Sequence, residues 1–238
     1  MFTAGPSFFG SGSSDPLRAN VIFLLSPQYM SAGTTINDQS QYAATGTRVN
    51  PSQSVSNTQT LFGGNTIDLG ASASVRYIEF AMGNRWANTH YMTIEMWLYF
   101  VSRDATLTRR IWETDGSAGT FSAYQRSTAD TPAGACNVGV ANETGTVPLN
   151  QWVHLCGMRA PGGGTNAWSF VDGALASSVS GTPANPTGVT KIFIGGGSTR
   201  SINAFLGGFR FTTGTSSTNL RYSTSGFTPP TTAFPIRS

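Results

Sequence analysis

The chain has 238 residues and a net charge of +3, and only 11% of its residues are charged. This length suits one all-β domain and is enough to bury a sizeable core. The basic residues are scattered, with Arg109-Arg110 as the only adjacent pair, which argues against a nucleic-acid binder. No apolar run is long enough to cross a bilayer, so we expect no membrane insertion.

Residues 1–15 form a distinct segment in which Phe2, Phe8 and Phe9 stand among Gly, Ser and Thr. Because a solvated tail rarely needs several aromatic residues, we predict an extended N-terminal arm that orders on a neighbour, with the phenylalanines as anchors. The alternative is a frayed terminus. The segment lacks the basic and apolar regions of a secretory signal peptide, so we expect synthesis in a cytoplasm.

Strands are predicted where apolar residues alternate with polar ones or run together between turn residues. In residues 92–100, one face carries Met92, Ile94, Met96, Leu98 and Phe100. The other predicted strands are residues 21–25, 67–69, 77–82, 110–113, 120–125, 135–141, 152–158, 167–172, 174–176, 191–194 and 205–212. Residues 26–60 are polar and turn-rich, and no amphipathic helix of useful length is evident.

These elements predict an all-β fold, an antiparallel β-sandwich of jelly-roll type. The expected organisation is an extended N-terminal arm at residues 1–15, the sandwich at residues 16–228, and a proline-rich tail at residues 229–238. Asp172-Gly173 is a strong signal for a two-residue hairpin turn.

Cys136 and Cys156 are the two cysteines of the chain. If residues 135–142 and 151–158 form a hairpin, the two side chains face each other across the strands. They would then form a disulfide or pack as two thiols, and cytoplasmic synthesis favours the thiols. Two cysteines with no convergent histidine do not suggest a zinc site.

Short segments in a characteristic order lie along the chain: Leu61-Phe62-Gly63-Gly64-Asn65, Trp152-Val153-His154, Phe170-Val171-Asp172-Gly173 and Phe205-Leu206-Gly207-Gly208-Phe209. Their order and spacing resemble the laminin-G-like branch of the concanavalin A-like jelly rolls, over residues 18–236. The tail that begins at Phe227-Thr228-Pro229-Pro230 resembles the copies carried on tailed-bacteriophage virion proteins. This fold is shared by binding modules, structural domains and glycanases, so fold alone does not give function.

The resemblance implies a bacteriophage virion structural protein, made in the host cytoplasm and placed on the virion surface, where it decorates and stabilises the capsid. The expected partners are the major capsid protein or other virion proteins, and sister copies in a homo-oligomer such as a trimer. Phe2, Phe8 and Phe9 would dock on the shell or on a sister subunit. The alternative function is a carbohydrate-binding adhesion module of a tail or head fibre that recognises host surface glycans.

A glycan site is predicted at Trp86, Asn88, His90 and Tyr91, which cluster just before the strand at residues 92–100. Aromatic rings stack on sugars, and the polar side chains supply hydrogen bonds. The alternative for aromatic residues near a strand is packing in a core or an interface.

No catalytic constellation is complete, so we predict that the protein is not an enzyme. Glu113-Thr114-Asp115 begins the E-x-D-x-x-E pattern of related glucanases, but Ala118 stands where the second Glu is required. Glu95 could face the same surface as Glu79, yet nothing in the sequence places them together. His154 has no G-x-S-x-G nucleophile elbow to serve, so we predict a hydrogen-bonded sheet residue rather than a base for Cys156.

No cofactor or metal site is predicted, with Ca²⁺ as the alternative because some relatives bind it between loops. Calcium requires six to eight oxygen ligands, several of them from carboxylates. Asp104, Asp115, Asp130 and Asp172 lie in predicted turns, but they are spread along the chain without a D-x-D cluster.

Overall fold

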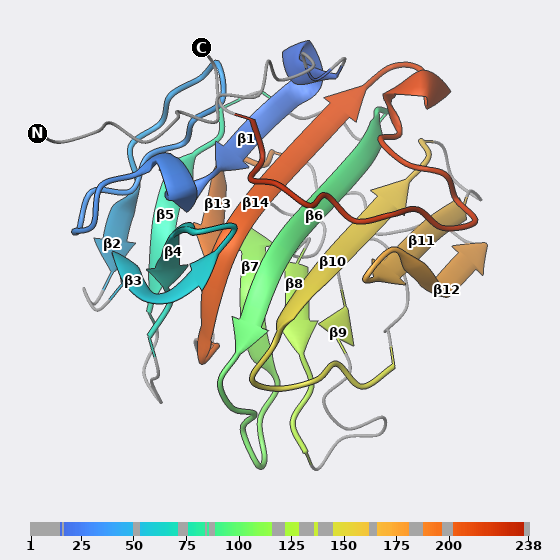
Figure 1. The fold of residues 1–238 in the computed structure, drawn as a ribbon. Helices are drawn as coiled ribbons and strands as arrows, with labels where there is room; N and C mark the ends of the chain where they lie inside the picture. Colours follow the sequence, from blue (N-terminus) through green and yellow to red (C-terminus); the bar gives the residue numbers. More distant parts are fainter. Residues whose placement is uncertain are drawn as a thin grey trace, which may run out of the picture.

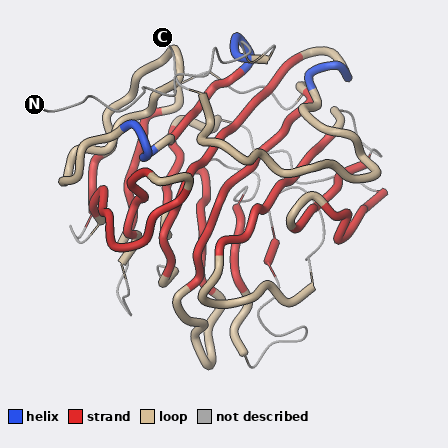
Figure 2. The backbone as a smooth tube through the Cα atoms, viewed as in Figure 1, coloured by secondary structure: helices blue, strands red, loops and turns tan. Residues whose placement is uncertain are grey.

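The computed structural model describes residues 15, 17–49, 53–70, 76–83, 85, 89–115, 122–128, 136–137, 145–161, 166–180, 188–196 and 202–235. These residues form two antiparallel β-sheets packed face to face, which confirms the predicted sandwich (Figure 1). Helix in this part of the chain is limited to short 3-10 turns, η1 (Arg18–Asn20), η2 (Pro27–Tyr29) and η3 (Ser217–Asn219) (Figure 2). None of the described helices has the length and hydropathy to span a membrane.

The larger sheet lies in front in Figure 1 and has eight strands in the order β12-β11-β10-β6-β14-β4-β3, with β1 also paired to β14. Its strands are β1 (Val21–Leu25), β3 (Ser54–Leu61), β4 (Gly64–Asp68), β6 (Tyr91–Phe100), β10 (Trp152–Arg159), β11 (Asn166–Val171), β12 (Ala174–Ser180) and β14 (Ala204–Gly214). The smaller sheet has the order β2-β5-β13-β7-β8-β9. Its strands are β2 (Thr47–Val49), β5 (Tyr77–Ala81), β7 (Arg109–Thr114), β8 (Ser122–Gln125), β9 (Cys136–Asn137) and β13 (Lys191–Ile194).

The core lies between the two sheets, and the apolar face predicted for β6 points into it. Met92, Ile94, Met96, Leu98 and Phe100 are all fully buried in one cluster with residues of the smaller sheet. Aromatic pairs bridge the sheets, since Phe23 of β1 meets Phe80 of β5 with ring centroids 4.9 Å apart. Full burial of one such side chain contributes about 1.5–3 kcal/mol, so this layer accounts for much of the stability of the sandwich.

The predicted hairpin between the two cysteines is wrong. Cys136 lies in β9, which pairs with β8 in the smaller sheet, whereas Cys156 lies in β10 of the larger sheet. The chain therefore changes sheet between these strands. A period of two tells which face of a strand is buried, but it does not tell which sheet the strand joins. Cys156 is a buried free thiol.

Residues 26–60, expected to be polar and turn-rich, also contain β2 and β3. Of the side chains of β3, Val55 and Leu61 are buried and the others are exposed or half-buried. β3 is an edge strand of the larger sheet. An edge strand packs few residues on the core, so its apolar alternation is too weak to detect in the sequence.

The hairpin at Asp172-Gly173 is confirmed, between β11 and β12. Both residues have positive φ, 48° and 77°, as the tight turn requires. Gly173 has a second role, because its carbonyl oxygen accepts a hydrogen bond from the N–H of Phe227 at 3.0 Å. A Cβ at Gly173 would overlap the carbonyl oxygen of Phe227, so no other residue fits here without displacing that segment.

After β14, residues 215–235 form a strap that crosses the outer face of the larger sheet, over β10, β6 and β14 (Figure 1). Phe227 packs in a small cluster with Phe170 of β11, and Phe234 is buried beside Val21 and Leu24 of β1. The hydroxyl of Ser26 donates to the carbonyl oxygen of Phe234 at 2.7 Å. The strap thus partly covers this face of the sheet. Phe227 packs on β11, and Phe234 packs on β1.

Candidate functional site

The structure describes part of the predicted site. Five of the predicted residues lie outside the described residues: Phe2, Phe8, Phe9, Trp86 and Asn88. His90 and Tyr91 are described, and both side chains are half-buried at the start of β6. Nδ1 of His90 is buried and has no hydrogen-bond partner in the described part of the chain.

A hollow of about 470 Å³ lies at the end of β5, where the chain enters the segment that carries the predicted loop. It is lined by Tyr42, Ala81, Met82, Gly83 and Arg85, and we call it the Tyr42–Arg85 hollow. The N–H groups of Met82 and Gly83 donate to the carbonyl oxygen of Thr190 at 2.6 and 3.2 Å. These bonds tie the floor of the hollow to the segment that leads into β13.

Asp38 holds the two side chains of this hollow in place. Its carboxylate is buried, accepts hydrogen bonds from the N–H groups of Leu24 and Ser40, and accepts one from Nη1 of Arg85 at 2.8 Å. The Arg85 guanidinium in turn lies over the ring of Tyr42, 4.3 Å from its centroid, while Tyr42 stays 44% exposed. The hollow therefore presents a fixed aromatic ring beside fixed N–H donors.

The pairing of Arg85 with Asp38 could not be recognised in the sequence. The two residues are 47 positions apart, and Tyr42 lies within residues 26–60, which were expected to be polar and turn-rich. Arg85, which lines this hollow, directly precedes Trp86 in the sequence.

A second hollow of about 380 Å³, the Tyr29 hollow, is formed by the chain between η2 and residue 39. Its lining residues are Tyr29, Met30, Ser31, Ala32, Gly33, Thr34, Thr35, Asn37 and Gln39. Tyr29 is 53% exposed, the largest exposure among the large hydrophobic residues that are described. Residues 29–39 supply the whole lining of this hollow, and Tyr42, three positions further on, contributes one residue to the Tyr42–Arg85 hollow.

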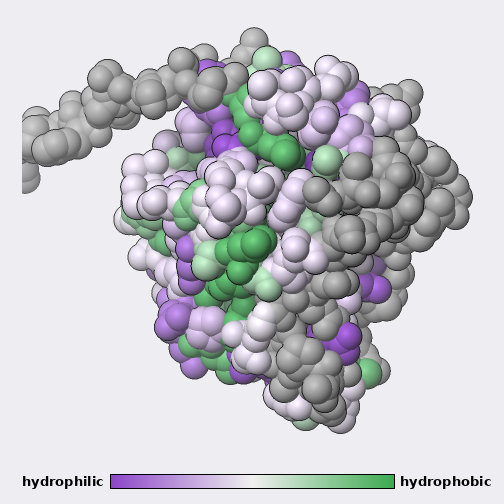
Figure 3. Space-filling model, turned by 90° about the vertical axis from the view of Figure 1, so that its right-hand side faces the viewer, coloured by the Kyte–Doolittle hydropathy of each residue, from purple (hydrophilic) through white to green (hydrophobic). Residues whose placement is uncertain are grey.

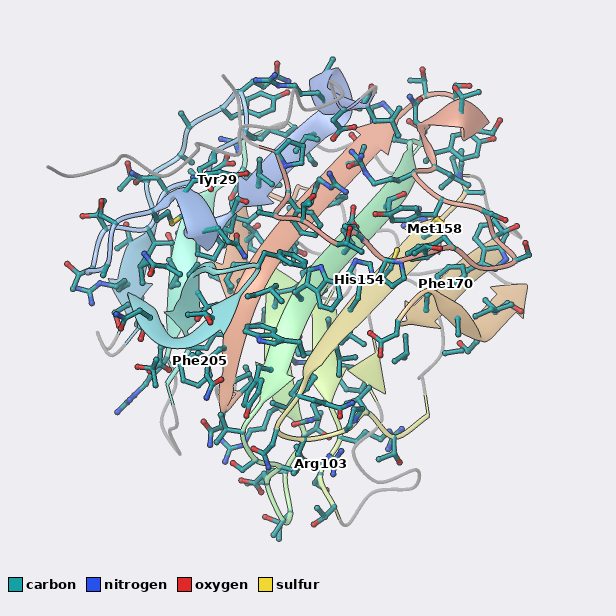
Figure 4. All side chains as sticks on the ribbon, in the orientation of Figure 1. Tyr29, Arg103, His154, Met158, Phe170 and Phe205 are labelled. Carbon is teal, nitrogen blue, oxygen red and sulfur yellow. The ribbon has the colours of Figure 1, made fainter. Side chains whose placement is uncertain are left out.

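A buried ionic network centred on Glu95 lies on the outer face of the larger sheet, beneath the strap, and Figure 4 labels one of its members, His154. Glu95 of β6 is fully buried. Its carboxylate accepts hydrogen bonds from Nε of Arg210 at 2.7 Å and from the hydroxyl of Tyr222 at 2.6 Å. Nε2 of His154 lies 3.2 Å away, so His154 is the hydrogen-bonded sheet residue that was predicted.

Arg221 of the strap extends the network to Asp15, close to the start of the described chain. Its Nη1 donates to Asp15 at 2.8 Å, and Nη1 of Arg210 lies 3.2 Å from the same carboxylate. Two carboxylates and two guanidinium groups therefore balance their charges, as buried ions must. The network locks β6, β10, β14, the strap and Asp15 together.

The electrostatics follow from burial and this pairing. Burial alone would raise the pKa of Glu95, but Arg210, His154 and Arg221 outweigh it and lower the pKa to about 2. Burial and the neighbouring Glu95 raise the pKa of Tyr222 far above its usual value. Burial also raises the pKa of the Cys156 thiol. These groups are held in one protonation state at neutral pH, which suits a structural cluster rather than proton transfer.

Two carboxylates considered for glycoside hydrolysis, Asp115 and Glu79, already pair with other groups of the chain. Asp115 accepts from the N–H groups of Thr190 and Lys191 at 2.7 and 2.6 Å, and Glu79 pairs with Nζ of Lys191 at 2.7 Å. Glu79 lies in the smaller sheet, whereas Glu95 lies in the larger one. Among the described residues, no group of three or more His, Cys, Asp and Glu side chains is placed to hold a metal ion.

Aromatic side chains of β6, β10 and β14, on the outer face of the larger sheet, pack mainly on one another. Tyr99 meets Trp152 and Phe205 edge to face, with ring centroids 5.6 and 6.3 Å apart. The indole N–H of Trp152 donates to the carbonyl oxygen of Thr60 at 2.9 Å. These rings close the sheet against the β3–β4 hairpin and leave the two hollows as the better candidates for ligand binding.

Residues 72–217 match the Laminin_G_3 family, described as the concanavalin A-like lectin/glucanases superfamily. No curated protein matches the chain in sequence.

Solved structures of the same fold include a botulinum neurotoxin type C structure whose report concerns cell entry through two ganglioside molecules. It aligns with a TM-score of 0.58 and 13% identity, over 84% of this chain and 49% of that one. The binding domain of botulinum neurotoxin serotype D/C aligns with a TM-score of 0.57 and 12% identity, over 82% and 49%. The sialidase of Trypanosoma rangeli, in complex with 2,3-difluoro-KDN, aligns with a TM-score of 0.55 and 14% identity, over 87% and 31%. The chain thus spans half or less of these proteins, and the likeness concerns the fold.

Proposed function

Because the chain belongs to the concanavalin A-like lectin/glucanase superfamily, we propose that it is a carbohydrate-binding domain without catalytic activity, and that the Tyr42–Arg85 hollow holds the sugar. The observation that carries the proposal is the exposed Tyr42 ring fixed beside the Arg85 guanidinium. A sugar offers a face of C–H groups and a rim of hydroxyls. The ring suits the first and the guanidinium N–H groups suit the second.

The fixed geometry favours binding for an energetic reason. A side chain that must be immobilised on binding costs about 0.5–1.5 kcal/mol. Asp38 already holds Arg85 in the free protein, and Arg85 already lies on Tyr42. The hollow therefore needs little ordering when a ligand enters, and its volume of about 470 Å³ falls in the range of small-molecule sites.

The fold neighbours support this reading without fixing the ligand. The botulinum neurotoxin type C structure concerns cell entry through gangliosides, and the Trypanosoma rangeli sialidase is in complex with 2,3-difluoro-KDN. Asp115 and Glu79 are both engaged by Lys191, through its N–H and its Nζ, which supports a binding domain rather than an enzyme.

The test is a glycan array carrying neutral and sialylated oligosaccharides, followed by titration calorimetry on each hit. Tyr42→Ala is expected to weaken binding about tenfold, since one aromatic contact contributes about 0.5–1.5 kcal/mol beyond its buried area. Leu107→Ala is the matched control, because Leu107 is also exposed but lies beyond the other end of β6. Unchanged binding by a folded Tyr42→Ala protein would refute this site, and silence across the array would refute the function.

We propose a bacteriophage virion surface as the second setting for this domain, with capsid proteins or sister copies as partners. Two observations support it. Asp15, the last residue of the predicted arm, is held on the sandwich by Arg210 and Arg221. In addition, β12 is an edge strand that pairs only with β11 in the described structure, and its Leu175 is 43% exposed. Figure 3 shows hydrophobic patches among pale, weakly polar residues on that side of the molecule.

The experiment is gel filtration with light scattering, with and without empty capsids of the source particle. Co-elution that is lost when residues 2–14 are removed would support docking through the arm. The virion role would be refuted if the chain does not co-elute with capsids and if neither the full chain nor the truncated chain self-associates. Glycan binding would then be the function to pursue.

A further inference from the structure

We propose that the Tyr29 hollow is a second binding site, and that it takes a neutral sugar. The inference rests on the proposed function in taking sugars as the ligand class, but it concerns different residues and a different ligand chemistry. Three observations carry it: the segment around the hollow is held by hydrogen bonds, four of its polar side chains make no hydrogen bond in the described part of the chain, and its lining contains no charged residue.

The segment around the hollow is fixed at several points. Gly33 and Val55 exchange two backbone hydrogen bonds of 3.0 and 2.7 Å, which join the segment to β3. The side-chain amide of Asn65 donates to the carbonyl oxygen of Met30 at 2.8 Å. Ile36 is fully buried in the core. The hollow is therefore preformed, and little conformational entropy is lost when it is filled.

Four polar side chains in the lining are free to bind, whereas Gln39 already accepts a hydrogen bond from the N–H of Ser26 at 2.7 Å. Ser31, Thr34, Thr35 and Asn37 make no side-chain hydrogen bond within the described part of the chain. Between them they offer hydroxyl groups that donate and accept, and an amide that does both. Such groups match the hydroxyls of a sugar ring, each of which also donates and accepts.

The aromatic part of the lining is Tyr29. More than half of its surface is exposed, at 53%, and Figure 4 shows it on the η2 side of the larger sheet. The face of an aromatic ring is electrically negative, so it attracts the slightly positive C–H groups of a sugar. An exposed ring beside unpaired hydroxyl and amide groups is thus complementary to a sugar on both of its surfaces.

The absence of charge selects the class of sugar. The lining of the Tyr29 hollow contains no Asp, Glu, Lys or Arg. A carboxylate or phosphate entering it would lose water without gaining a cation, which is costly. The hollow therefore excludes acidic sugars and accepts a neutral hexose, in contrast to the Tyr42–Arg85 hollow with its guanidinium.

The experiment is an NMR titration of the ¹⁵N-labelled chain with methyl glycosides of glucose, galactose, mannose and N-acetylglucosamine, and separately with N-acetylneuraminic acid. At least one neutral glycoside is expected to shift the amide signals of residues 29–39. N-acetylneuraminic acid is expected to leave those signals unmoved, and 0.5 M NaCl is expected to leave the neutral affinity within twofold.

Variants then assign the contacts. Tyr29→Ala is expected to weaken the neutral glycoside about tenfold, and Asn37→Ala about threefold to tenfold. Thr35→Val keeps the volume of the side chain and removes its hydroxyl, so it tests hydrogen bonding without opening a cavity. Leu107→Ala is the matched control, because Leu107 is exposed and lines neither hollow, and it is expected to leave the affinity read from the signals of residues 29–39 within twofold of the wild type.

The inference is overturned if no neutral glycoside moves these signals, if Tyr29→Ala binds as well as the wild type, or if N-acetylneuraminic acid binds there equally well. Failure of the first site is a separate result, because it appears as unchanged binding in Tyr42→Ala while the signals of residues 29–39 still respond.

Discussion

Replacing Glu95 by Gln tests whether the buried ionic network holds the strap on the sheet. The variant keeps the size of the side chain and removes its charge, so Arg210 and Arg221 retain Asp15 as their only carboxylate partner in the network. The pKa of Glu95 is lowered from 4.5 to about 2 in the folded chain. A shift of this size corresponds to about 3 kcal/mol of stability, and removal of one partner from a buried ion pair typically costs about 3–5 kcal/mol.

The pH dependence has a definite sign. The folded pKa of Glu95 lies below its unfolded value, so its charge stabilises the folded chain fully above pH 4.5. That contribution is lost as the pH falls toward 2, where the folded protein also takes up the proton. The free energy of unfolding is therefore expected to be about 3 kcal/mol higher for the wild type than for Glu95→Gln at pH 7, and this difference is expected to disappear as the pH falls from 4.5 toward 2. Asp15, whose pKa is also lowered, titrates in both proteins and largely cancels in the difference.

The assay is urea unfolding followed by tryptophan fluorescence at pH 7, 4 and 2.5. Glu79→Gln is the matched control, because Glu79 is half-buried and pairs with the exposed side chain of Lys191 near the surface, where the loss of an ion pair is expected to cost at most about 1 kcal/mol. Equal stability of Glu95→Gln and wild type at pH 7, or a gap that stays constant down to pH 2.5, would contradict the reasoning.

Other predictions concern the strap and the cysteine. Gly173→Ala should lower the stability by about 1–3 kcal/mol, because φ is 77° and the added carbon meets Phe227, whereas Gly145→Ala, with open space around it, should leave the melting temperature unchanged. Phe227→Ala should cost about 2 kcal/mol through its stack on Tyr222, 3.8 Å between centroids, and its contact with Phe170; calorimetry would show whether it does. Cys156 should resist iodoacetamide in the native chain at pH 8 and react in urea, as read by peptide mass; rapid native labelling would contradict its burial and raised pKa.

Local pattern was enough for much of the sandwich. The alternation in β6 identified its core face correctly, because the side-chain period of a strand is fixed by the backbone. The Asp-Gly pair located the β11–β12 hairpin, because a tight turn with positive φ admits few residue types. The role of His154 was also foreseen, although its partner Glu95 was not.

Most of the strands, the buried face of β6 and the tight turn at Asp172-Gly173 could therefore be predicted from sequence, because they depend on a few neighbouring residues. Tertiary structure alone decided which sheet receives Cys136, and brought Asp38 to Arg85 across 47 positions and Asp15 to Arg221 across 206. Neither hollow could be foreseen for the same reason. Each depends on how a polar, irregular segment lies against the ends of the strands, and that is set by long-range packing rather than by any period in the chain.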